Sequence, residues 1–247
     1  FVDPATGEPR VACYCRGGVK IYDPVAGGAA LVVIDVDSHV EALAVFKDPA
    51  TGEPRLACGC QDKKVRIYDP VAGGEALLVI DVGSNVYSLA VFTDPATGAP
   101  RLACGTSKND SATDSWIYDV RVFDPVAGGE ALVVLKMDDE VDALAAFKDP
   151  ATGAPRLACA SEKKVLVFDP VVGGDALLVL DIGSYVNALA VFKEPATSAP
   201  RLVCGSMDGK VRIFDAVSGG DTLLVLDVGS PVGALVAFKD LATGGCP

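Results

Sequence analysis

The order of apolar and polar residues along this chain predicts short β-strands throughout. Residues 65–69 alternate apolar and polar side chains and are rich in β-branched residues, which is typical of a strand. Residues 76–82 are almost all apolar, as expected for a strand covered on both faces. Further strands are predicted at 56–60 and 86–92, with Gly- and Pro-rich turns between the segments. Because no segment has apolar residues at helical spacing over a helical length, we predict an all-β fold.

This four-strand pattern is repeated along the whole chain. The marker Asp-Pro-Ala-Thr-Gly starts at Asp3, Asp48, Asp94 and Asp149, and variants start at Glu194 and Asp240. A period of about 45 residues with four strands is typical of a β-propeller, in which each period forms one sheet, whereas solenoid coils are shorter. We therefore predict a single β-propeller domain over residues 1–247, with repeat units at about 3–47, 48–93, 94–148, 149–193 and 194–239.

The two ends of the sequence predict how the ring closes. The first unit lacks the strand that corresponds to 86–92, whereas residues 232–238 repeat that strand once more near the C-terminus. If the segment Val232–Phe238 pairs into the first sheet, five complete blades of four antiparallel strands form a ring without a free edge. We predict this five-bladed, closed arrangement.

Two segments resemble the repeat signature of the WD-repeat (WD40-like) β-propeller family. These are Gly205-Ser-Met-Asp-Gly-Lys-Val-Arg-Ile-Phe-Asp215, preceded by Leu202-Val-Cys, and Cys60-Gln-Asp-Lys-Lys-Val-Arg-Ile-Tyr-Asp69. The aromatic-Asp pair recurs in every unit. The resemblance implies a non-catalytic platform that presents one face of the ring to partners.

The chain departs from this family in three ways. Each family Trp is Tyr or Phe here, and the Gly-His dipeptide is Gly-Ser at 83–84, 183–184 and 229–230. The hydrogen-bonded tetrad that the family builds from Asp, His, Ser and Trp therefore cannot form in full. Five blades are also fewer than is usual in the family, so a larger ring is the alternative to the closed ring of five.

The charge and hydropathy of the chain exclude several classes of partner. Asp and Glu number 33 against 21 Lys and Arg, for a net charge of −12. Nucleic-acid binders need a basic face to displace the counterions of phosphates, so we predict no nucleic-acid partner. No apolar run approaches the roughly 18 residues of a membrane span, so no membrane association is expected. No signal peptide is visible in a chain that begins at Phe1, and we predict a cytoplasmic monomer.

The eight cysteines invite a disulfide or zinc interpretation, which their register argues against. Five of them occupy one repeated position: Cys13, Cys58, Cys104, Cys159 and Cys204. Stacked sheets lie about 10 Å apart, beyond the reach of a disulfide. Cys15 and Cys60 add two Cys-x-Cys pairs without a neighbouring histidine. We predict free, metal-free thiols, with the repeated cysteines buried as small apolar residues in a reducing compartment.

No residue pattern indicates an enzyme. His39 is the only histidine, and no nucleophile motif lies near it, so an acyl-transfer triad is not expected. Paired carboxylates could support glycoside hydrolysis, but the acids recur in every unit, whereas a catalytic acid is needed once. No phosphate-binding Gly-rich loop occurs. We predict neither catalysis nor a cofactor.

The candidate binding residues are those that differ between units at one repeated place. They flank the fixed Val at the start of the innermost strand, and their spacing of two points both members of a pair to the same side. These residues are His39 and Glu41, Asn85 and Tyr87, Glu140 and Asp142, Tyr185 and Asn187, and Pro231 and Gly233. The loop between the next two strands also varies: Arg16-Gly17, Gln61-Asp62, Glu162-Lys163 and Met207-Asp208. The two sets are expected at the same end of the sheets.

The third unit adds an insertion at this end of the predicted sheets. It runs from Thr106 to Ser115 and is followed by Trp116-Ile-Tyr118, which includes the only tryptophan of the chain. Trp and Tyr are enriched at binding hot spots. Packing of the insertion against itself is the alternative explanation for Trp116.

These observations predict a protein-interaction scaffold whose variable face binds a protein or peptide. A lectin-like carbohydrate-binding propeller is the alternative, although its pockets would require the same aromatic and polar residues in every unit. A recently amplified structural module without a strong partner is a third interpretation.

Overall fold

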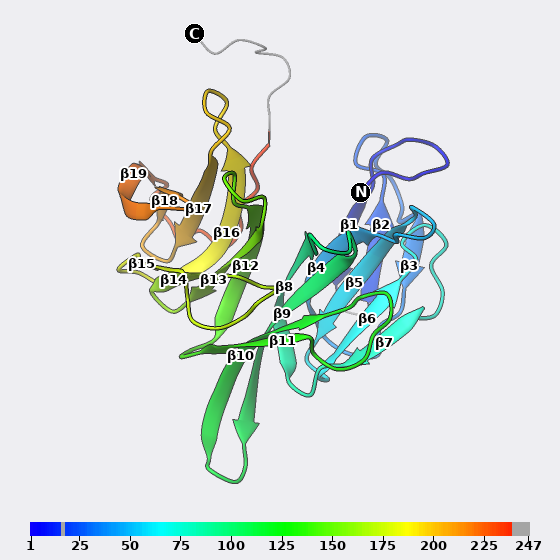
Figure 1. Cartoon of the computed structure of the whole chain (residues 1–247). Helices are drawn as coiled ribbons and strands as arrows, with labels where there is room; N and C mark the ends of the chain where they lie inside the picture. The colour runs from blue at the N-terminus through cyan, green and yellow to red at the C-terminus, as the bar shows by residue number, and fades with distance from the viewer. Residues whose placement is uncertain (16–17, 239–247) are drawn as a thin grey trace.

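The structure is a computed structural model that describes residues 1–15 and 18–238. It contains five antiparallel β-sheets, arranged side by side along an arc (Figure 1). The predicted all-β class is confirmed. The variable pair Arg16-Gly17 and the marker at Asp240 lie outside the described residues.

The strands follow the predicted pattern, and each sheet is a meander. Sheet one consists of β1 (Val11–Cys15), β2 (Gly18–Tyr22) and β3 (Val32–Ile34). Sheet two consists of β4 (Val40–Lys47), β5 (Pro54–Cys60), β6 (Lys64–Tyr68) and β7 (Leu78–Asp81). Sheet three consists of β8 (Asn85–Thr93), β9 (Pro100–Asp110), β10 (Ser115–Phe123) and β11 (Val133–Met137). Sheet four consists of β12 (Val141–Lys148), β13 (Pro155–Ser161), β14 (Lys164–Phe168) and β15 (Leu178–Asp181). Sheet five consists of β16 (Val186–Lys193), β17 (Pro200–Ser206), β18 (Lys210–Asp215) and β19 (Gly219–Asp227).

The inner strands β4, β8, β12 and β16 lie next to one another along the concave side of the arc. Each inner strand is joined to the second strand of its own sheet by an Asp-Pro-Ala-Thr-Gly turn or its variant. The sequence units therefore begin one strand later than the sheets do. In sheets two to five the inner strand also carries a register shift at one equivalent place, which identifies a β-bulge just after the fixed Val.

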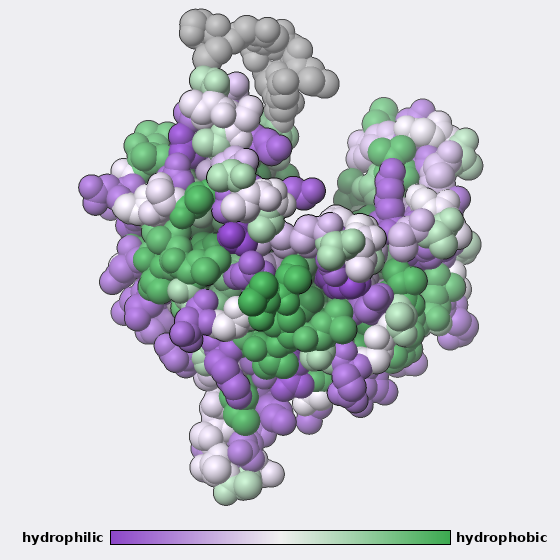
Figure 2. Space-filling view, viewed as in Figure 1, coloured by the Kyte–Doolittle hydropathy of each residue, from purple (hydrophilic) through white to green (hydrophobic). Residues whose placement is uncertain are grey.

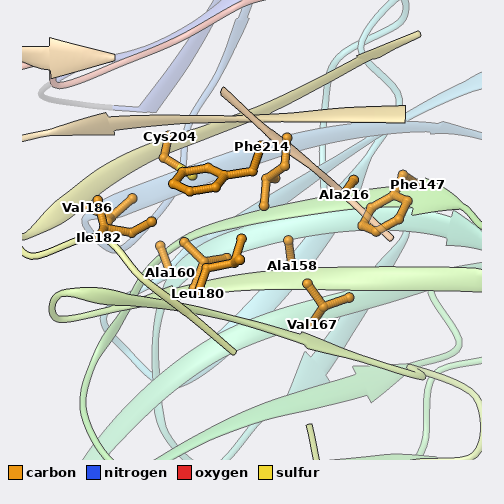
Figure 3. Packing of buried hydrophobic residues seen from close by; sticks show 12 residues of the cluster. Phe147, Ala158, Ala160, Val167, Leu180, Ile182, Val186, Cys204, Phe214 and Ala216 are labelled. Carbon is orange, nitrogen blue, oxygen red and sulfur yellow. The ribbon is translucent and has the colours of Figure 1, made fainter. Parts of the chain in front are cut away.

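Neighbouring sheets are held together by apolar side chains that interlock between them. Between sheets four and five, Leu180 and Ile182 of one sheet pack with Cys204 and Phe214 of the next (Figure 3). Equivalent clusters join sheets two to three and three to four. Fully burying side chains of this size contributes about 1.5–3 kcal/mol each, so these contacts are the main source of stability.

The repeated cysteines belong to these contacts in four of the five sheets. Cys58, Cys104, Cys159 and Cys204 are buried and free, as predicted. Burial raises the pKa of the Cys58 and Cys204 thiols to about 12, which keeps them protonated and unreactive. Cys13 was also predicted to be buried, and that prediction is wrong. Cys13 and its neighbour Cys15 are exposed, because among the described residues no sheet packs on the side of β1 that carries them.

The predicted closure of the ring is not seen among the described residues. Sheet one has three strands, and residues 229–238 belong to no strand. Phe1 already occupies part of the place expected for the closing strand: its N–H₃⁺ donates to the carbonyl of Arg10 at 3.1 Å, and Arg10 N–H donates back at 2.8 Å. The equivalent residue Phe46 pairs with Arg55 in sheet two. A closing strand that reached Phe238 would therefore compete with Phe1 for Arg10.

Candidate functional site

The two ends of the sheets differ in their chemistry. We call the end that carries the β4–β5 and β6–β7 turns and their equivalents the turn face. The opposite end, which carries the β5–β6 loops and the connections between sheets, is the variable face. The predicted binding residues lie at the variable face, and the repeated Asp-Pro turns lie at the turn face.

At the turn face, one arginine in each sheet joins two turns. Arg101 donates from Nη2 to Asp94 at 3.0 Å and from Nη1 to Asp124 at 3.1 Å. Equivalent ion pairs are formed by Arg10 with Asp3 and Asp23, Arg55 with Asp48 and Asp69, Arg156 with Asp149 and Asp169, and Arg201 with Glu194 and Asp215. Two carboxylates share one guanidinium at each place, so the turns of a sheet are held in a fixed relation.

The same acidic residues also stabilise their own turns. Asp94 Oδ1 accepts the N–H of Ala96 at 2.9 Å, and Gly98 ends the turn with φ = 71°, a conformation that favours glycine. This backbone hydrogen bond, followed by Thr97 and the charge of Arg101, holds the pKa of Asp94 below its ordinary value. The repeated residues of the turn face are therefore explained by folding.

At the variable face, the loop between the second and third strands is fixed to the start of the inner strand. In sheet two, Gln61 N–H donates to the carbonyl of His39 at 3.1 Å, and Asp62 N–H donates to Ser38 Oγ at 3.2 Å. In sheet five, Met207 N–H donates to the carbonyl of Tyr185 at 2.9 Å. These bonds bring the two variable sets together, as predicted.

Two of the variable pairs form a local contact across the bulge. His39 Nε2 lies 3.5 Å from Glu41 Oε1, which also accepts from Gln61 Nε2 at 2.5 Å. Asn85 Nδ2 donates to the Tyr87 hydroxyl at 3.3 Å. The two members of each of these two pairs therefore point to the same side of the strand, in agreement with the prediction from their spacing.

Carboxylates from two sheets gather near the middle of the arc. Glu140 is partly buried, and this desolvation raises its pKa, with the charges of Asp142, Asp139 and Glu41 adding to the effect. Desolvation also raises the pKa of Asp142, followed by the charge of Asp139. Because the charge of Glu41 contributes to the raised pKa of Glu140, the start of β4 is linked with the start of β12, two sheets away.

Tyr118 connects this acidic group to the hairpin of sheet three. The pKa of its hydroxyl is raised by desolvation and by the charges of Asp139 and Glu140, with Tyr87 nearby. Trp116 stacks on Tyr118, with ring centroids 6.4 Å apart and planes at 15°. Self-packing therefore accounts for one face of Trp116, but 54% of the residue remains exposed.

The hairpin is formed by the extended strands β9 and β10, and it projects from the variable face (Figure 1). Polar pairs dominate its outer part, where Ser115 faces Asp110 and Trp116 faces Asn109. In the space-filling view the projecting part carries little of the hydrophobic colour found over the sheets (Figure 2). The hairpin is thus a polar arm with one half-exposed tryptophan near its tip.

Tyr185 and Asn187 form a separate part of the variable face at sheet five. The ammonium group of Lys163, from the β13–β14 loop, lies 5.5 Å from the centre of the Tyr185 ring. Tyr185 is half exposed, and Asn187 is partly buried. The structure therefore divides the predicted residues into a central group around Glu41, Tyr87, Glu140 and Asp142 and a lateral group around Tyr185.

The sequence analysis missed two kinds of residue. The five bridging arginines follow each marker acid by seven positions, from Arg10 after Asp3 to Arg201 after Glu194, and this constant spacing was the available signal. Asp139 was also missed. It replaces the serine of the Gly-Ser dipeptide found at Ser84 and Ser184.

Within 1–15 and 18–238, His, Cys, Asp and Glu form no group of three or more that could hold a metal ion. His39 is largely exposed and pairs with Glu41. Over the same residues, no helix is long and apolar enough to cross a bilayer.

Comparison with known proteins confirms the resemblance to WD repeats. The family model described as WD domain, G-beta repeat matches residues 181–215, which run from the end of β15 through β18. That segment contains one of the two signatures identified in the sequence. No curated protein sequence matches the chain.

Solved propeller-type structures share the fold at low sequence identity. Two crystal structures of BBS1N in complex with ARL6DN, soaked with lead and with mercury, match 92% of this chain and 67% of the matched chain. Their TM-scores are 0.65 and 0.67, and the identity is 16% in both. The computationally designed Ika8 protein matches 95% of this chain and 66% of its own, with a TM-score of 0.61 and 23% identity. The chain thus spans about two thirds of each of these structures.

Proposed function

We propose that this chain is a non-catalytic scaffold that binds a protein or peptide at its variable face. The proposal rests on the aromatic residues of this face. Tyr87 and half-exposed Tyr185 stand at positions where the other units hold different residues, and half-exposed Trp116 belongs to an insertion that only the third unit carries. The repeated acids of the turn face already have partners in the five bridging arginines. Tyr and Trp combine a large apolar surface with a polar group, which suits a protein interface.

The comparison with solved structures supports the same proposal. BBS1N, whose fold is similar, was crystallised in complex with a second protein, ARL6DN. This concerns BBS1N itself, and at 16% identity no contact residue is transferred to the present chain. It supports the choice of a protein as the class of ligand.

The five sheets would act as one domain, residues 1–247, with the repeat units as its blades. Four apolar contacts join the sheets in series, so the two groups of the variable face are held at a fixed distance from each other. The free thiols are consistent with a cytoplasmic location. A partner that contacts both groups would bridge sheets two to five.

A pull-down experiment with the purified chain as bait tests the proposal. The bait would be the unchanged chain, the double variant Trp116→Ala/Tyr185→Ala, or Val172→Ala, which alters an exposed side chain at the turn face. We expect proteins captured by the unchanged chain to be retained by Val172→Ala and lost with the double variant. Capture that survives the double variant but not Val172→Ala would contradict the assignment of the face.

A further inference from the structure

The four contacts between sheets are copies of one asymmetric contact. Each sheet has a forward face, which packs on the next sheet along the chain, and a backward face, which packs on the previous one. In sheet two the forward face carries Val65, Ile80 and Val82. The backward face carries Leu56 and Cys58, which pack on sheet one.

The outer part of the forward face of sheet five, along β19, is uncovered. Leu226 is 48% exposed, whereas the equivalent Ile80 of sheet two is 2% exposed. Val228 and Leu224 are likewise exposed, although Val82, the equivalent of Val228, is buried. Exposed contiguous apolar residues of this kind mark interaction surfaces.

The backward face of sheet one is uncovered as well. Val11, Cys13 and Cys15 are exposed, whereas the equivalent residues of sheet two, Leu56, Cys58 and Cys60, are fully buried. The two ends of the arc therefore expose the two complementary halves of the contact that the chain forms four times within itself.

The segment after β19 already lies where the next sheet would begin. Val232 N–H donates to the carbonyl of Ser206 at 3.1 Å, and Val232 packs with Val203 and Val211 of sheet five. A Cβ added at Gly205 would meet Val232 Cγ1 at 2.6 Å, just as one added at Gly59 would meet the equivalent Val86 Cγ1 at 2.7 Å. The segment thus occupies the position of an inner strand, but no further strands of a sixth sheet follow it among the described residues.

We propose that these two ends bind each other between copies of the chain, so that sheet five of one copy packs on sheet one of a second copy. Residues 232–237 then pair with β1 of the second copy and complete its sheet. By equivalence with sheet two, where Leu43 pairs with Cys58, Leu235 of one copy faces Cys13 of the other. The occupant is a second copy because, among the described residues, the backward face of sheet one is the exposed surface that has the matching half of this contact.

Closure within one chain is disfavoured by the packing of the arc. The two ends are separated by an open notch (Figures 1 and 2). The curvature is set by four close-packed contacts, and bringing the ends together would require all four to shift.

A head-to-tail contact between copies leaves these four contacts within each copy unchanged. It produces a closed ring if the rotation between copies closes and an open chain if it does not. This proposal differs from the monomer that was expected from the sequence.

Light scattering after size exclusion tests the association with the complete chain. We expect a mass of at least two copies of the 25.3 kDa chain at micromolar concentration. Leu226→Asp, at a site already exposed in the single copy, should reduce it to one copy. The matched control is Leu223→Asp on the same strand, because Leu223 is 55% exposed and the equivalent Leu77 is 59% exposed in an interior sheet. Leu223→Asp should keep the higher mass.

A disulfide distinguishes contact between copies from closure within one copy. Opposed residues of antiparallel strands have Cα atoms about 4.5–5.5 Å apart, which a disulfide can span. Leu235→Cys should therefore form a bond with Cys13 on mild oxidation, and non-reducing gels should show dimers or larger species. The unchanged chain gives the background, and Leu43→Cys, which faces Cys58 within sheet two, is the control for a bond inside one copy.

Two results of the mass and disulfide experiments would overturn the proposal. One is a single-copy mass for the unchanged chain at every concentration. The other is a Leu235→Cys disulfide that forms within one copy, which would show that the ring closes on itself. Labelling of Cys13 and Cys15 by iodoacetamide adds a readout in the native protein: both should be slowed by at least tenfold in the assembly relative to Leu226→Asp, whereas equal rates would contradict the contact.

Discussion

The turn face and the variable face are built on the same strands but differ in how many of their side chains have partners within the fold. At the turn face, every repeated aspartate among the described residues has a bridging arginine and a backbone N–H as partners, as Asp94 does with Arg101 and Ala96. At the variable face, the backbone contacts repeat, but the side chains of His39, Tyr87 and Tyr185 do not. The comparison teaches that repetition in this chain marks structural demand, and that variation between copies marks residues free for binding.

Removal of a bridging arginine should have the largest effect and should act on stability alone. Arg101→Ala leaves Asp94 and Asp124 without their shared cation, and we expect the free energy of unfolding to fall by about 2–3 kcal/mol. Urea denaturation measures this change. Partner affinity should be unaltered at temperatures where the variant is folded. A drop in partner affinity without loss of stability would contradict the distinction between the two faces.

Truncation of an aromatic residue at the variable face should have the opposite signature. For Tyr185→Ala we expect a loss of about 2 kcal/mol in partner affinity, or roughly thirtyfold in Kd, if the residue is a binding hot spot. Stability should change by less than about 0.5 kcal/mol, because the side chain is half exposed. Titration calorimetry with a captured partner tests both this variant and Trp116→Ala, and Val172→Ala is the control.

Ser184 belongs to the Gly-Ser dipeptide that is repeated at the variable face. Its substitution should affect stability less than loss of a bridging arginine and more than loss of Tyr185. Ser184 Oγ accepts the N–H of Asp208 at 3.2 Å and so fixes the β17–β18 loop. Ser184→Ala should lower the free energy of unfolding by about 1 kcal/mol, since it removes one hydrogen bond. If this residue instead proved neutral in stability and important in binding, repetition would no longer identify structural positions at this end.

The smallest effect is expected from the acidic group near the middle of the arc. Because the pKa of Glu140 is raised in the folded protein, the folded state binds this proton more tightly than the unfolded chain. The stability associated with Glu140 is therefore greatest at low pH and is lost as the pH rises above the ordinary glutamate value of 4.5. Glu140→Gln should remove this dependence and stabilise the protein near pH 7 by less than about 1 kcal/mol, since solvent screens the group.

Thermal melts of Glu140→Gln and the unchanged chain between pH 4 and pH 8 measure that difference. Glu75→Gln, at an exposed carboxylate of the turn face, is the control for the loss of one negative charge. A profile for Glu140→Gln that runs parallel to that of the unchanged chain would mean that the carboxylate is not destabilised by its surroundings.

Much of the local structure was predictable from the sequence because it depends on short-range rules. Alternation at 65–69 and the apolar run at 76–82 correspond to β6 and to a segment that contains β7. The Asp-Pro turns follow from local hydrogen bonds and the glycine conformation. The placement of His39 and Gln61 at one end followed from counting strands in a meander, and their backbone hydrogen bond agrees with it.

Contacts between units could not be predicted in this way, because equivalent residues have the same local sequence wherever their unit lies. Cys13 and Cys58 share one repeat position, yet Cys13 is exposed and Cys58 is buried, since only the latter has a sheet packed over it. Leu226 and Ile80 differ for the same reason. The sequence by itself determined the strands, the turns and the face on which each variable residue lies. Only the tertiary structure decided the curvature of the arc and which ends stay uncovered, because both depend on how whole sheets pack.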